Sequence, residues 1–172
     1  MKKRFLSLLC VLALCLGLLP VTALAAAPSG QELYVGDMQI SSTGYWTTGE
    51  DGNITQYTGG GTPTDNYIHY NADDNILTLH NATIKKGLAY DQSTPAGSTI
   101  HGSAIGVLNQ SGDAELTVQL EGSNMIDEVS AGIYVHSSGG GAALSIAGNG
   151  TLFIGIVKKS AHPTYFIRRP DS

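Results

Sequence analysis

The sequence predicts an all-β protein, a short parallel β-helix in which coils of β-strand stack into a solenoid. The first observation is a repeat, because residues 103–126 align with residues 131–154 at a constant distance of 28 positions. The second is alternation within each copy, where apolar residues occupy every other position, as in a strand with one buried face. A repeat of about 20 to 50 residues is typical of stacked architectures. An ordinary β-sandwich with chance similarity between its strands is the alternative.

The chain opens with residues 1–25, a segment typical of a secretory signal. A basic start (residues 2–4) precedes an apolar run (residues 5–19) and an Ala-Leu-Ala site (residues 23–25). The apolar run is shorter than the about 20 residues that a membrane-spanning helix needs. We therefore expect cleavage after Ala25 and a mature protein that is secreted or held at the cell surface, with no membrane segment left.

Cleavage of this segment would change the chemistry of the chain. Both cysteines, Cys10 and Cys15, would be lost, which leaves no thiol for a disulfide or a metal site. The basic residues would fall from nine to six against fourteen acidic ones, a net charge of −8. Between residues 26 and 157, only Lys85 and Lys86 are basic. Such a surface repels phosphate groups, so nucleic acid and anionic membranes are excluded as expected partners.

Residues 26–74 form a predicted N-terminal cap that is rich in aromatic residues. Amphipathic rings suit the apolar faces of sugars, and neighbouring amide and carboxyl groups suit their hydroxyls. The predicted carbohydrate-binding residues are Tyr45, Trp46, Tyr67 and Tyr70. The alternative is that these rings only cover the first coil.

Residues 75–156 are the predicted β-helix coils. The segment NILTLHNATI (residues 75–84) offers a third copy of the repeat, with Leu77 aligned to Leu116 at a distance of 39. The longer distance is explained by a predicted loop at residues 91–103, which is rich in Ser, Gly and Pro. In a stack of coils we expect leucines to line the interior and hydroxyl groups to form a ladder outside. These rows are Leu77, Leu116 and Leu144 inside and Thr78, Thr117 and Ser145 outside.

Three stretches together resemble secreted parallel β-helix proteins of the pectate-lyase-like kind from Gram-positive gut bacteria. They are LYVGDMQISSTGYWTTGEDGNITQ, YNADDNILTLHNATI and the GIYV and LSIAGNGTL coils, within residues 32–156. The resemblance implies a right-handed helix and a carbohydrate-binding or adhesin-like surface role. Lyases of this fold use an arginine base beside calcium, and the repeat region has no arginine. The resemblance therefore supports the fold more than an enzymatic activity.

Residues 157–172 differ in composition from what precedes them. They lack glycine and hold four of the six basic residues that cleavage would leave. One interpretation is a cap that shields the last coil. The other is a truncated gene or a shifted reading frame, with the natural protein continuing beyond residue 156.

No motif predicts a catalytic, metal or cofactor site. Asp73 and Asp74 are adjacent and are expected to shape a turn rather than to form a glycosidase pair. The pair Asp51-Gly52 predicts a hairpin turn rather than a calcium loop, which would carry more ligands. The strand face that holds Glu121 is interpreted as solvated, and the five histidines show no spacing of paired metal ligands.

The sequence therefore predicts an extracellular, non-catalytic surface module, carbohydrate-binding or adhesin-like, with polysaccharide or host glycan as its partner. Two alternatives remain open. One is a polysaccharide lyase or hydrolase that lacks its catalytic coils, and the other is a structural spacer that displays something else.

Overall fold

A computed structural model describes residues 26–89, 101–129 and 131–155. The described part is built from β-strands and turns. Their order follows the alternation seen in the sequence, with Gly, Asn and Asp at the turns. The strands are β1 (Gln31–Val35), β2 (Met38–Ile40), β3 (Gly44–Thr48), β4 (Ile54–Gln56), β5 (Tyr67–Asn71), β6 (Ile76–His80), β7 (Thr83–Ile84), β8 (Leu88–Ala89), β9 (His101–Asn109), β10 (Ala114–Glu121), β11 (Ser123–Ile126), β12 (Ala131–Ser137), β13 (Ala142–Gly148) and β14 (Thr151–Ile154).

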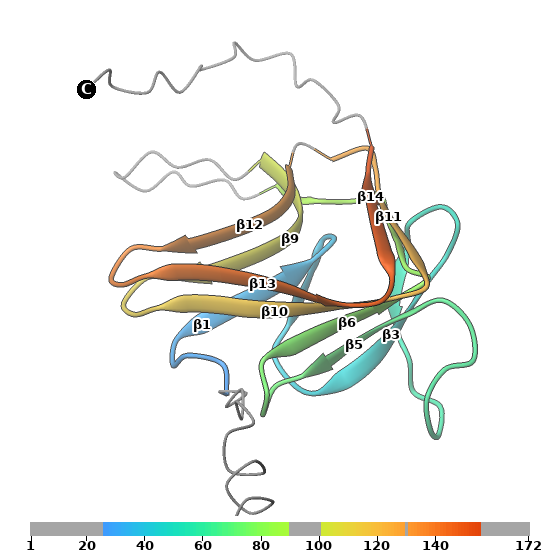
Figure 1. Ribbon diagram of the computed structural model, residues 1–172, viewed down its shortest axis with the longest axis horizontal. Coiled ribbons are helices and arrows are strands. Elements are labelled where there is room, and N and C mark those ends of the chain that lie inside the picture. The colour runs from blue at the N-terminus through green and yellow to red at the C-terminus, as the bar shows by residue number, and fades with distance from the viewer. Residues whose placement is uncertain (1–25, 90–100, 130, 156–172) are drawn as a thin grey trace, which may run out of the picture.

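The strands form three sheets around a common core (Figure 1). The first sheet has the order β12-β9-β1-β2, with β8 also paired to β9, and the second has the order β13-β10-β6-β5-β3-β4. These two sheets face each other, and the third sheet, β14-β11-β7, lies at one side. In all three sheets the strand from the second repeat copy, namely β12, β13 or β14, is an edge strand.

The 28-residue repeat is confirmed as a pairing register between neighbouring strands. Parallel pairing joins β9 to β12, β10 to β13 and β11 to β14, and each pair places residues 28 apart side by side. Ile105 thus pairs with Ile133, and Leu116 pairs with Leu144. Because like residues become neighbours, most apolar positions of the first copy are continued in the second, although Leu108 pairs with His136 and Leu120 with Gly148.

The third copy is present but was aligned wrongly by two positions. Leu77 pairs with Val118 rather than with Leu116, a distance of 41 instead of 39. A shift of two keeps the same side chains on the same face, so alternation alone could not detect it. The expected hydroxyl ladder is correspondingly shortened. Thr117 pairs with Ser145 as expected, but Thr78 pairs with Gln119.

All three sheets contribute to one hydrophobic core. Leu33 and Val107 enter it from the first sheet, Leu79 from the second and Ile126 from the third, each at most 2% exposed. Full burial of such a side chain contributes about 1.5–3 kcal/mol. The predicted cap is part of this same assembly, because β1 pairs with β9 and β5 pairs with β6.

The predicted right-handed parallel β-helix is wrong as a fold class. The first two sheets mix parallel and antiparallel pairs, the third is parallel, and none of the three closes or curls, so the described strands do not form a solenoid. The physical reason lies in short turns such as residues 35–38 and 71–76, which fold strands back beside their predecessors as antiparallel neighbours. The arrangement is nearer to the sandwich that the sequence left as its alternative.

Three buried asparagines, Asn75, Asn109 and Asn124, join segments that are distant in sequence. Asn124 accepts a hydrogen bond from the backbone of Ala82 and donates to the carbonyls of Glu121 and Thr151. One side chain therefore satisfies backbone groups of three successive segments. Buried amides are tolerated when they are bonded in this way.

Two predicted segments lie outside the described residues, namely the signal at 1–25 and the tail at 157–172, and most of the predicted loop at 91–103 lies there as well. Those predictions stay untested. Among the described residues there is no helix with the length and apolar character needed to span a membrane.

Candidate functional site

The candidate site is the outward face of the second sheet where β3, β5 and β6 lie side by side. Along these strands apolar side chains point to the core and polar rings point outward. Antiparallel pairing puts Tyr45 opposite His69, and Tyr67 opposite His80. We call these four residues the aromatic–histidine face.

The four rings are packed on one another across the strands. Tyr45 and His69 stack with ring centroids 4.2 Å apart, and Tyr67 and His80 stack at 4.7 Å with nearly parallel planes. Tyr45 and Tyr67 meet edge to face at 5.6 Å. Cross-strand pairs of this kind stabilise a sheet by about 0.2–1 kcal/mol each. A ring surface used in such a stack is not free to contact a ligand.

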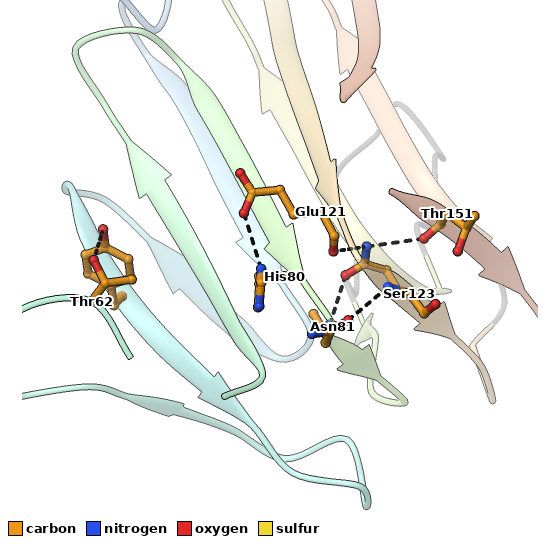
Figure 2. A network of polar contacts seen from close by, with 9 residues as sticks. Thr62, His80, Asn81, Glu121, Ser123 and Thr151 are labelled. Carbon is orange, nitrogen blue, oxygen red and sulfur yellow. Dashed lines mark hydrogen bonds and ion pairs between the residues drawn. The ribbon is translucent and has the colours of Figure 1, made fainter. Parts of the chain in front are cut away.

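A carboxylate lies at the β10 side of this face. His80 Nδ1 lies 3.2 Å from Glu121 Oε2, and both side chains are partly exposed (Figure 2). At the other side the Tyr45 and Thr62 hydroxyl groups lie 3.3 Å apart, and either oxygen can donate. The face therefore offers hydroxyl, imidazole and carboxylate groups within one row.

Partial burial shifts the protonation of two groups in the row. Desolvation raises the pKa of Tyr67, and the nearby charge of Glu121 raises it further. Desolvation also lowers the pKa of His69 below its usual 6.5. Both shifts favour the neutral form, so the inner part of the row stays uncharged near neutral pH.

The structure divides the four predicted carbohydrate-binding residues between two environments. Tyr45 and Tyr67 lie on the aromatic–histidine face, whereas Trp46 and Tyr70 are each 4% exposed and belong to the core. The Tyr70 hydroxyl donates to Asn75 Oδ1 at 3.1 Å. Adjacent residues of a strand point to opposite sides, so Tyr45 and Trp46 could not share one surface.

Sequence reasoning missed His69 and His80 as members of this row. A search for metal-ligand spacing along the chain could not find them, since their neighbours lie across strands. The available signal was the alternation Tyr67, His69 in the segment YIHYN, which places both rings on one strand face. The sequence predicts a solvated face for Glu121, whereas its side chain is 41% exposed and pairs with His80.

Two predicted turns are confirmed. Residues 49–53 connect β3 to β4, which pair as a hairpin, and Gly52 has a positive φ of 76°. The backbone N–H of Asn53 donates to Asp51 and lowers the pKa of that carboxyl. Asp73 lies in the turn before β6, where its backbone N–H donates to Asn71. In the part of the chain that the structure describes, no group of three metal-binding side chains converges.

Comparison with family models, with curated proteins and with solved structures finds no match to this chain.

Proposed function

We propose that this chain is a non-catalytic structural module, a β-framework that spaces or presents other parts of an extracellular assembly. The observation that carries the proposal is the common 28-residue register of its three parallel strand pairs. The repeated residues therefore serve the pairing of the framework strands. Residues 1–25 support export, because their basic start, apolar run and Ala-Leu-Ala site resemble a secretory signal.

The bonding of the interior supports this function. Leu116, Val118 and Ile126 are almost fully buried, and each continues into the second copy at its register partner. The backbone ladders and Asn124 tie successive segments together. Load applied along the chain would therefore be shared by many parallel hydrogen bonds.

The outward rings of the second sheet also support the framework function. Tyr45, His69, Tyr67 and His80 use ring faces on one another, which strengthens the pairing of β3, β5 and β6. In a framework, such rows stabilise the part of the second sheet where the pairing is antiparallel.

Single-molecule pulling on the chain tests this function. We expect one cooperative rupture, since the three sheets share a core, and a clearly lower rupture force in Leu116→Ala. Leu144→Ala is the matched control, because it removes the same atoms from the edge strand. Gradual extension at low force in the wild type would contradict a framework role.

Carbohydrate binding at the aromatic–histidine face is a second candidate function. The observation that favours it is that Tyr45 and Tyr67 lie in one partly exposed row with the carboxylate of Glu121. Amphipathic rings with a polar rim are suited to polysaccharide or host glycan. Because the ring faces are largely stacked, such a site would act mainly through hydrogen bonds to sugar hydroxyls.

A glycan-array screen separates the two functions. Saturable binding that is lost in both Tyr45→Ala and Tyr67→Ala, but kept in Tyr57→Ala, would establish the second candidate. Trp46→Ala is not a useful probe of contact, since this core residue would destabilise the fold. No binding by the folded wild type would leave the framework function alone.

A further inference from the structure

One end of the molecule is formed by the edge strands β12, β13 and β14, and β13 and β14 carry exposed apolar side chains there. We call these three strands the end face. Leu144, Ile146 and Ile154 are the register partners of the buried Leu116, Val118 and Ile126, yet they are 40%, 56% and 48% exposed. Phe153, which precedes Ile154 on β14 and therefore points to the other side of that strand, is 64% exposed. They are the large apolar side chains that the described residues leave most exposed.

The backbone of the end face is also open. Each of its strands pairs on one side only, β12 with β9, β13 with β10 and β14 with β11, within the ranges described. An edge strand presents alternate N–H and C=O groups, which can pair with another strand. In Figure 1 these strands lie together at the border of the three sheets.

The charge of the end face distinguishes it from the rest of the chain. Natural edge strands are commonly protected by charged residues or proline. From Val129 to Val157 the sequence contains no Asp, Glu, Lys, Arg or Pro. The remaining sequence is acidic, with fourteen acidic residues in all, so two copies would repel each other across most other surfaces.

We propose that the end face binds a second copy of this chain, with β13 pairing against β13 of the partner across a two-fold axis. The face is complementary to itself, because an uncharged edge of the same length and the same apolar side chains meet in both copies. Two-fold pairing makes the two β13 strands antiparallel, and the partner copy then covers Leu144 and Ile146 of each chain. This inference deepens the proposed framework function, on which it rests, by naming the partner through which the framework is extended.

The mass of the purified full chain in solution tests the proposal, by light scattering over a wide range of concentration. The wild type is expected to be a dimer. Ile146→Lys puts a charge in the centre of the end face and should weaken the dimer by at least about tenfold. Gln56→Lys is the matched control, since it adds the same charge to β4, the opposite edge of the same sheet. All variants share residues 5–19, so any association through that apolar run is common to them.

A dimer that persists in Ile146→Lys and in Leu144→Lys, both folded by circular dichroism, would overturn the proposal. A wild type that is monomeric throughout, forms polydisperse aggregates, or binds neutral phosphatidylcholine vesicles in place of itself would also overturn it. Should Ile146→Lys fail to fold, Leu144→Lys alone carries the test. A monomer that still ruptures cooperatively under load would remove the dimer and leave the framework function standing.

Discussion

Leu116 and Leu144 are side-by-side partners on β10 and β13, yet Leu116 is 2% exposed and Leu144 is 40% exposed. The two residues have the same type and the same place in the repeat. They differ because β10 has a neighbour on each side, β6 and β13, whereas β13 is an edge strand. Position in the assembly therefore decides what an identical residue contributes to stability.

Leu116→Ala should lower the free energy of unfolding by about 2–5 kcal/mol, because it opens a cavity in the core. In the monomer, which dilution favours, Leu144→Ala should lower the free energy of unfolding much less, since the Leu144 side chain has solvent on one side. Urea unfolding of both variants measures the difference. Equal losses would show that β13 is covered in solution, and a concentration dependence of the Leu144→Ala loss would assign the cover to a second copy.

Asn124→Ala should lower the free energy of unfolding by about 1–3 kcal/mol or more, because it leaves polar groups of buried segments without partners. These are the N–H of Ala82 and the carbonyls of Glu121 and Thr151. Asn149→Ala changes the same residue type at an exposed turn and is the control. Thermal unfolding compares them, and similar losses would argue against the three-segment contact.

Acid should destabilise the fold through His69. Desolvation lowers the pKa of this side chain below 6.5, so the unfolded chain binds the proton more readily than the folded one. The stability that depends on neutral His69 is present above pH 6.5 and is lost as the pH falls toward the folded pKa. His69→Gln should flatten this part of the profile in urea titrations. An unchanged profile would place the acid sensitivity elsewhere.

Alkali should act through Tyr70 in the opposite direction. Burial raises the pKa of its hydroxyl above 10.0, so the unfolded chain releases the proton first. The contribution is complete below about pH 10 and is lost as the pH rises toward the folded pKa. Tyr70→Phe should reduce that loss, although it also removes the bond to Asn75. Ultraviolet titration of the tyrosinates should show Tyr70 ionising late, and ionisation at the usual pH would contradict its burial.

The register of the last six strands could be predicted from the sequence because matched residues recur at a fixed distance. The fold class could not, since alternation reports a buried face but not whether the neighbouring strand is parallel or antiparallel. The short turn between β5 and β6 makes these two strands antiparallel neighbours. The resemblance to parallel β-helix proteins supported the parallel pairing of the repeats, but it did not predict antiparallel pairs such as β5 with β6.

The candidate site was half predicted for a related reason. Tyr45 and Tyr67 were chosen for their ring chemistry, and both lie on the outward row. Trp46 and Tyr70 were chosen on the same ground but fall on the buried side. Applying strand parity to each ring would have separated them. The pairing of His80 with Glu121 joins residues 41 positions apart and requires the strand order, which the sequence did not reveal.

A disulfide trap tests most directly whether residues 28 apart are held side by side. Thr117→Cys combined with Ser145→Cys places two thiols on register partners of β10 and β13, in a chain carrying Cys10→Ser and Cys15→Ser. Neighbouring strands are about 4.8 Å apart, within the range that a disulfide can bridge. We predict rapid oxidation to an intramolecular crosslink, and little in the control pair Thr117→Cys with Ile146→Cys, whose side chains point to opposite faces. Equal crosslinking of both pairs, or none in either, would contradict the register on which this account depends.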